Sequence, residues 1–301
     1  MVAVTQTRRR LGRFGVWVAP FTLLDTPVAV QREQFARIER LGYGSLWSGE
    51  TPPGAPMGSR EVFTQHGLML AATQRIVVGT GIANIGIRTA GAMHTGAATL
   101  AEAYPGRFVL GLGGHTGARP LARLREYLDA MDRSAGTLTR LPAYPRVFAA
   151  LGPRAHQLAS ERADGVHPFL QPVAHTAAAR VAVGPDALVI PHQAVVLDTD
   201  PDAARGRLRA IFALGVGAAD SPYTAHYRRL GYSEADLAGQ RSDRLVDDVL
   251  AWGDEAAVAA RLTAHLDAGA DHVLVNPFAA MDLPAAVDQL ERLAPLLVDP
   301  V

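Results

Sequence analysis

The chain has 301 residues, with 29 basic and 29 acidic side chains and a formal net charge of zero. This balance favours neither nucleic acid nor an anionic membrane as a partner. The sequence contains no cysteine and no lysine. Their absence excludes disulfides, thiolate nucleophiles, cysteine-ligated metal sites and lysine Schiff bases.

Length and apolar content predict one large domain. Hydrophobic residues make up 49% of the chain, which is enough to bury a core. No run of about 18 apolar residues is present, so we expect a cytoplasmic protein that binds a small molecule and has no membrane or nucleic-acid partner. We treat residues 1–301 as a single domain, in which the basic stretch before the first strand makes residues 1–12 a flexible tail.

Short apolar runs alternate with helical patterns along the first half of the chain. Uninterrupted apolar runs indicate strands buried on both faces, and three- or four-residue apolar spacing indicates helices. The expected strands are Phe14–Val18, Ser45–Trp47, Arg75–Ile82 and Arg107–Leu112, and the expected helices are about Val28–Leu41, Glu61–Ala72, Ala90–Tyr104 and Pro120–Asp132.

The same alternation continues to the C-terminus. The expected strands are Arg146–Leu151, Gly165–Phe169, Gln193–Asp198 and His272–Asn276, with helices opening at Pro153 and covering about Val173–Val183 and Leu283–Leu297. A series of helical segments from Pro201 to Ala268 separates the last two strands. Eight strand–helix units in this length predict an α/β fold, a (β/α)8 TIM barrel with a helical excursion between strands seven and eight.

This topology selects candidate site residues, because the chemistry of such barrels takes place at the carboxyl ends of the strands. The residues expected there include Ala19, Glu50, Gly81, Ile82, Asn84, Gly113, Gly114, His115, Gly152, Pro153, Arg154, His167 and Phe169.

Two glycine-containing turns follow strands four and five. Gly111–His115 and Leu151–Arg154 each lead from a strand into a helix, where exposed backbone amides can bind an anion. Arg154 adds a guanidinium to the second turn. Together the turns would suit one phosphate-bearing ligand, and ordinary helix capping is the alternative interpretation.

Other enzyme classes lack their characteristic residues. The first strand carries no His-x-His pair, so no dedicated metal site is expected. Glu50 is the only carboxylate expected at the rim among the first six strands, whereas a glycosidase needs two. No G-x-S-x-G elbow is present. Away from the rim we expect His94 to pack within its helix, and we expect five histidines on helix surfaces: His66, His156, His175, His226 and His265.

Three stretches, in this order, resemble the luciferase-like flavin and deazaflavin oxidoreductases. They are Ile76–Asn84, Ala101–Gly113 and Asp267–Val273, and the resemblance extends from about Arg13 to Leu297. Within that family the chain is most similar to the actinobacterial branch that uses coenzyme F420, a deazaflavin. The resemblance implies a barrel that forms a homodimer, with the cofactor ring over the strand ends.

The resemblance also assigns roles to residues. It implies a non-prolyl cis peptide at Gly81–Ile82, against the ring, whereas the glycines of strand three would otherwise be explained by tight packing. Substrate would stack near Phe21, Trp47 and Phe169. The residues implied for cofactor binding are Ala19, Thr80, Gly81, Ile82, Asn84, Gly113, Gly114, Leu151, Gly152, Pro153, Arg154 and His167.

The chain departs from this family at the end of strand two. Many deazaflavin relatives carry a histidine there to handle a proton, but this chain ends the segment with Glu50. Glu50 or His115 is therefore the expected proton-transfer residue, and a solvated or salt-bridged Glu50 is the alternative. The loop after strand four is also shorter than in relatives.

The residues and the resemblance together leave three functions open. The main hypothesis is F420-dependent hydride transfer to or from a small organic substrate, in which the cofactor supplies the redox step. A monooxygenase that uses reduced FMN is the second. A flavin- or deazaflavin-binding protein without turnover is the third.

Overall fold

Parallel strands form the centre of the structure. The computed structural model describes residues 2–52, 54–55, 57–114, 117–213, 221–277 and 282–299. All strand pairings within this part of the chain are parallel. The strands are β1 (Phe14–Val18), β2 (Ser45–Ser48), β3 (Val77–Thr80), β4 (Ala83–Asn84), β5 (Phe108–Gly113), β6 (Arg146–Phe148), β7 (Gly165–Val166), β8 (Leu188–Val189), β9 (His192–Val196), β10 (Leu250–Trp252) and β11 (Val273–Pro277).

The segment from β8 to β9 closes the sheet into a barrel. The strand order is β10-β9-β11-β1-β2-β3-β5-β6-β7-β8, so the two consecutive strands β8 and β9 stand near opposite ends of the sheet. Between them, Ile190 N donates to Val166 O at 2.9 Å on β7, and Leu274 N on β11 donates to Pro191 O at 2.9 Å. One continuous segment therefore bonds to both neighbours, which confirms the TIM-barrel prediction.

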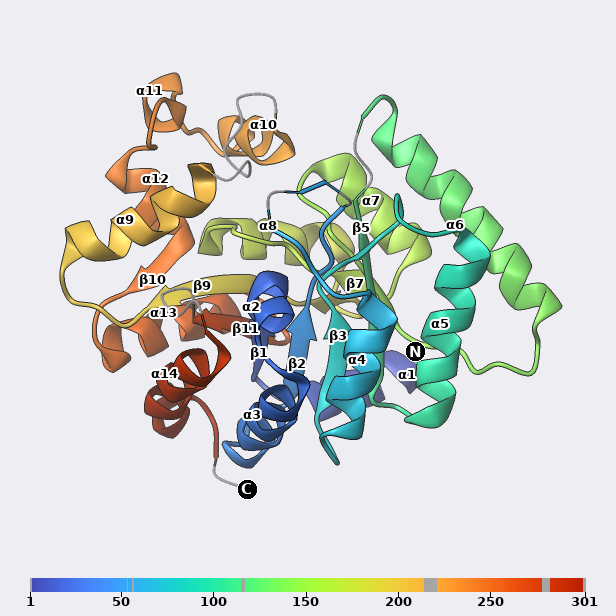
Figure 1. Cartoon of the computed structure of the whole chain (residues 1–301). Helices are drawn as coiled ribbons and strands as arrows, with labels where there is room; N and C mark the ends of the chain where they lie inside the picture. The colour runs from blue at the N-terminus through green and yellow to red at the C-terminus, as the bar shows by residue number, and fades with distance from the viewer. Residues whose placement is uncertain are drawn as a thin grey trace.

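Helices surround this barrel. They pack their apolar faces against the strands, as expected for parallel strands buried on both sides, and Figure 1 shows them around the outside of the sheet. The barrel helices are α2 (Pro20–Asp25), α3 (Val28–Arg40), α4 (Val62–Ala71), α5 (Ala90–Ala103), α6 (Pro120–Thr137), α7 (Pro153–Arg162), α8 (Val173–Val183), α13 (Glu255–Asp267) and α14 (Leu283–Leu297).

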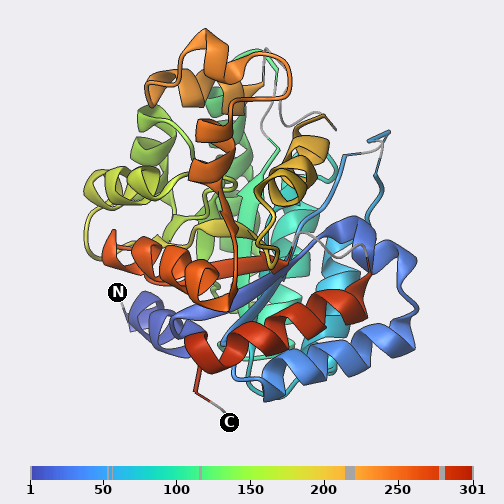
Figure 2. The same cartoon turned by 90° about the vertical axis from the view of Figure 1, so that its left-hand side faces the viewer.

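The excursion before the last strand forms a cap with its own small core. Its helices are α9 (Pro201–Ile211), α10 (Pro222–Arg229), α11 (Glu234–Leu237) and α12 (Asp243–Val249). Side chains of Asp200, Ser221, Ser233 and Ser242 accept hydrogen bonds from the first turns, which explains where each helix begins. Strand β10, which lies in a segment expected to be helical, pairs with β9. Figures 1 and 2 place the cap at the end of the barrel toward which β1 and β2 point.

The N-terminal segment differs from the expected flexible tail. Residues Val2–Leu11 form helix α1, and the side chain of Leu11 is fully buried. Arg8 Nε lies 2.7 Å from Asp271 Oδ1. A Cβ at Gly44 would come within 1.8 Å of Leu11 O, so α1 packs tightly against the bottom of the barrel.

Large side chains fill the interior of the barrel below the strand ends. Trp17, Trp47 and Ile190 belong to this cluster. Trp47 is fully buried, so it cannot stack on substrate as expected. A Cβ at Gly79 would come within 2.4 Å of the Trp47 ring, which means that packing explains this glycine. These side chains fill the barrel interior beneath the strand ends.

Candidate active site

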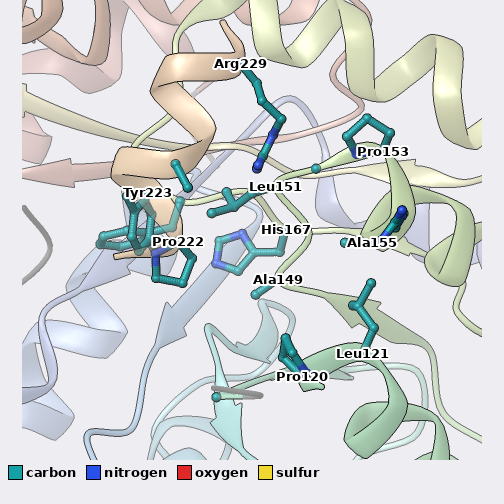
Figure 3. A pocket seen from close by; sticks show the side chains of 15 residues that line it. Pro120, Leu121, Ala149, Leu151, Pro153, Ala155, His167, Pro222, Tyr223 and Arg229 are labelled. Atoms are coloured by element: carbon teal, nitrogen blue, oxygen red, sulfur yellow. The ribbon is translucent and has the colours of Figure 1, made fainter. Parts of the chain in front are cut away.

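A cavity of about 640 Å³ lies at the carboxyl ends of β6 and β7. This volume is within the range of small-molecule sites. Its walls come from the barrel and from α10 of the cap, and Figure 3 shows Tyr223 and Arg229 of α10 reaching over His167 and Leu151. The Phe169 and Tyr223 rings meet edge to face at 6.5 Å between centroids. The cap therefore forms one side of the site.

Half of the residues predicted to bind a cofactor line this cavity. They are Gly114, Leu151, Gly152, Pro153, Arg154 and His167. The cavity wall does not include the other six described candidates, Ala19, Thr80, Gly81, Ile82, Asn84 and Gly113. His115 lies outside the described residues.

Part of the wall was not predicted from the sequence. The additional lining residues are Pro120, Leu121, Ala149, Ala155, Pro222, Ala225 and Arg229. Their local signals, such as a proline after Ser221 in the first turn of α10, mark where helices begin. Those signals do not say which helix covers the barrel.

The Gly81–Ile82 junction lies beside the cavity floor. Its peptide bond is cis, as the resemblance implied. Trp17 Nε1 donates to Gly81 O at 3.0 Å, and Glu50 N donates to Ile82 O at 3.1 Å. A Cβ at Gly81 would come within 2.6 Å of Trp17 Nε1 and 2.9 Å of His167 Nε2. These two side chains occupy the space beside Gly81.

Two other residues of this strand end have structural partners. The Thr80 hydroxyl bonds to Gly111 O and accepts from Gly111 N, both at 2.8 Å. Asn84 Oδ1 accepts from Gly86 N at 2.8 Å. Thr80 therefore holds β3 against β5, and Asn84 holds the turn that follows it in the chain.

Glu50 forms a buried ion pair. Arg88 donates to both of its carboxylate oxygens, and Asn84 N donates to Glu50 Oε2 at 3.1 Å. The Glu50 side chain is 3% exposed and that of Arg88 is 10% exposed. This arrangement matches the alternative of a salt-bridged Glu50 and ties the end of β2 to the loop after β3.

The cavity presents positive charge. Arg154 and Arg229 are among its described lining residues, and none of those residues is acidic. Pro153 occupies the first turn of α7, and its fixed φ suits that position. A Cβ at Gly152 would come within 3.2 Å of Arg229 Nη2, so the guanidinium lies close to the start of α7. A helix start with two guanidiniums favours an anionic ligand group.

Three buried histidines connect α10 to the barrel. Arg229 Nη2 donates to His226 Nδ1 at 3.3 Å, so His226 Nε2 carries the proton and donates to His175 Nδ1 at 3.0 Å. The rings of His175 and His156 lie 5.3 Å apart. All three side chains were expected on helix surfaces, as were His66 and His265, but all five are buried. Segments distant in sequence cover them, as the contacts of His66 with Gly79 O and of His265 with Gln193 show, and a helical pattern does not reveal such contacts.

Burial keeps these histidines neutral. Desolvation lowers the pKa of His175 to about 3 and that of His226 to about 4. His94 packs against Tyr144, with 2.9 Å between Nδ1 and the hydroxyl, as expected. In the part of the chain that the structure describes, no group of three His, Cys, Asp or Glu residues is arranged to hold a metal ion.

The comparison with protein families decides the classification. The model of the luciferase-like monooxygenases matches residues 13–272. The chain belongs to the luciferase-like monooxygenase family. It is therefore an oxidoreductase of this class, with the barrel fold that the resemblance implied.

Individual relatives of this luciferase-like chain fall in two cofactor groups. A Mycobacterium tuberculosis protein named for coenzyme F420-dependent oxidoreductase activity is 27% identical, over 74% of this chain and 83% of the relative. An F420-dependent secondary alcohol dehydrogenase, solved with an F420–acetone adduct, has a TM-score of 0.68 at 15% identity and covers 96% of this chain and 99% of its own. The oxygenating constituent of 3,6-diketocamphane monooxygenase from Pseudomonas putida, solved with FMN, has a TM-score of 0.63 at 14% identity and covers 96% and 98%. The two structures establish a shared fold.

Within the described ranges, no helix has both the length and the apolar character needed to cross a bilayer.

Proposed function

We propose that this protein is an F420-dependent oxidoreductase that transfers a hydride between the deazaflavin and a small organic substrate. The observation that carries the proposal is the cavity at the strand ends, which combines apolar walls with two arginines and, among its described lining residues, no acidic one. The F420-dependent name of the mycobacterial relative supports the deazaflavin over FMN.

The lining residues suit this cofactor class. A ring system needs apolar walls, which Leu151, Ala149 and Phe169 supply. A phosphate needs N–H donors and positive charge, which the start of α7 supplies with Arg154 and Arg229. The buried Nε2 of His167 has no partner among the described residues and offers an acceptor to a bound group.

The protein's own contribution is binding and positioning. When bound, the deazaflavin supplies hydride chemistry. Tyr223 and Arg229 of α10 exclude water from one side of the cavity, and the hydrogen bond of Arg229 to His226 fixes the orientation of its guanidinium. The proton-transfer roles of Glu50 and His115 remain proposals. The ion pair with Arg88 favours a positioning role for Glu50.

Titration with F420 and with FMN tests the proposal. We expect micromolar binding of F420 and weaker binding of FMN, measured by the change in cofactor fluorescence. Arg154→Ala and Arg229→Ala should each weaken F420 binding by about tenfold, because each removes a charge-assisted hydrogen bond.

Arg133→Ala is the matched control. Arg133 is an exposed arginine of α6 that does not line the cavity, so this variant should bind like the wild type. Absence of F420 binding at micromolar concentration would rule the proposal out, and tight FMN binding with oxygen-dependent turnover would establish the monooxygenase alternative.

A further inference from the structure

His167 has one nitrogen with a fixed partner and one without. Its Nδ1 lies 2.8 Å from Ile190 O. A carbonyl oxygen only accepts, so this contact assigns the proton to Nδ1 and leaves Nε2 as a hydrogen-bond acceptor. His167 N also donates to Phe148 O at 2.9 Å, which holds the backbone at the end of β7. The acceptor is therefore fixed in both orientation and tautomer.

The acceptor is buried but unpaired. His167 is 1% exposed, and Nε2 has no hydrogen-bond partner in the part of the chain that the structure describes. Most buried polar atoms are paired, because an unpaired one loses the hydrogen bond it would make in water. This one belongs to a cavity wall, and Figure 3 shows the His167 ring near the centre of that cavity. A bound molecule can supply the missing donor.

The surroundings keep the imidazole neutral. The centroid of the Trp47 ring lies 5.3 Å from that of the imidazole, and a Cβ at Gly81 would come within 2.9 Å of Nε2. Burial lowers the pKa of His167 to about 4. A neutral Nε2 accepts a hydrogen bond from an O–H or N–H group, whereas it offers nothing to a carbonyl or a carboxylate in the same position.

We propose that His167 is a specificity-determining residue that selects, for this cavity, a ligand group with an O–H or N–H donor. The proposal rests on the proposed function and deepens it, because it requires the ligand group bound against His167 Nε2 to be a hydroxyl or an N–H group. Two sources carry this chemistry: a substrate alcohol, or an N–H group of the cofactor ring.

Nitrogen-15 NMR on histidine-labelled protein tests the proposal without turnover. The probes are F420 alone, cyclohexanol alone and cyclohexanone alone, so that no hydride can be exchanged. A shift of the His167 Nε2 resonance with F420 alone identifies the cofactor as donor. A shift that requires cyclohexanol, and does not occur with the ketone, identifies the substrate. No shift with F420 or cyclohexanol at saturating concentration would overturn the proposal.

His167→Asn provides the matched variant. An asparagine amide can still donate to Ile190 O but has no acceptor at the position of Nε2, so the fold should persist, as checked by chemical denaturation. We expect about tenfold weaker binding of the donor ligand and unchanged binding of cyclohexanone. Equal losses for the alcohol and the ketone would overturn the proposal.

His94→Asn is the control. His94 Nε2 is also buried without a partner in the described structure, yet His94 does not line the cavity. The His94 resonance should not shift with F420 or cyclohexanol, and His94→Asn should bind both as the wild type does. If cyclohexanol shifts His167 while F420 does not bind at all, the proposed cofactor is wrong but the donor selection by His167 stands.

Discussion

The free energy of unfolding should fall steeply as the pH drops from 6.5 to 4. Burial lowers the pKa of His167, His226, His265 and His272 to about 4 and that of His175 to about 3. In the unfolded chain each of these histidines has a pKa near 6.5. Between these values the unfolded state binds more protons than the folded state, so acid favours unfolding.

The expected magnitude is large. Each histidine removes about 1.4 kcal/mol of stability per pH unit within that window, and no further stability once the pH is below the folded pKa. Domains of ordinary stability have only about 5–15 kcal/mol in total, so we expect the protein to unfold before pH 4. Urea denaturation at a series of pH values from 7.5 to 4.5 measures the slope.

His265→Gln checks which groups cause the effect. His265 lies between Thr176 and Gln193, at 2.8 Å from each, and glutamine does not titrate. This variant should reduce the slope of the free energy of unfolding against pH by the contribution of one histidine, whatever its absolute stability. Arg133→Ala should leave that slope unchanged. A free energy of unfolding that is constant from pH 7 to pH 5 would contradict the prediction.

Breaking the Glu50–Arg88 ion pair should destabilise the fold by about 3 kcal/mol. Glu50→Gln leaves the Arg88 guanidinium beside a neutral amide, with Glu61 at 3.1 Å as its remaining carboxylate. The double variant Glu50→Gln with Arg88→Met removes both charges, so we expect it to lose less stability than the sum of the two single variants. Chemical denaturation of all four proteins completes the cycle.

An exposed pair serves as the control for this cycle. Arg125 and Glu161 lie 2.9 Å apart, with side chains 45% and 40% exposed, and Glu161→Gln should cost at most about 0.5 kcal/mol. If Glu50 acted mainly in proton transfer, the result would differ: Glu50→Gln would keep the stability of the wild type and lose turnover.

The barrel was predictable because each of its elements is encoded locally. Helix α8 spans the predicted Val173–Val183 and β1 spans the predicted Phe14–Val18. Apolar runs, turn residues and helix caps act over a few residues and are visible in the sequence. Among the strands, β4, β8 and β10 were not predicted, because with two or three residues each they are too short to produce a recognisable pattern.

The site was only partly predictable. Knowing the strand ends was enough to place Gly152, Arg154 and His167 at the cavity, since parallel strands in a barrel all end on one face. The same reasoning placed Glu50 at the rim but did not reveal its ion pair with Arg88, which follows it by 38 residues.

The sequence by itself determined the strand–helix alternation, the strand ends and the family to which the chain belongs. The tertiary structure alone decided that Arg229 of α10 lines the cavity, and that histidines expected at helix surfaces are buried. The physical reason is the distance along the chain over which each property is determined. Periodicity and capping depend on neighbouring residues, whereas burial and the pKa of a histidine depend on which distant segments pack against it.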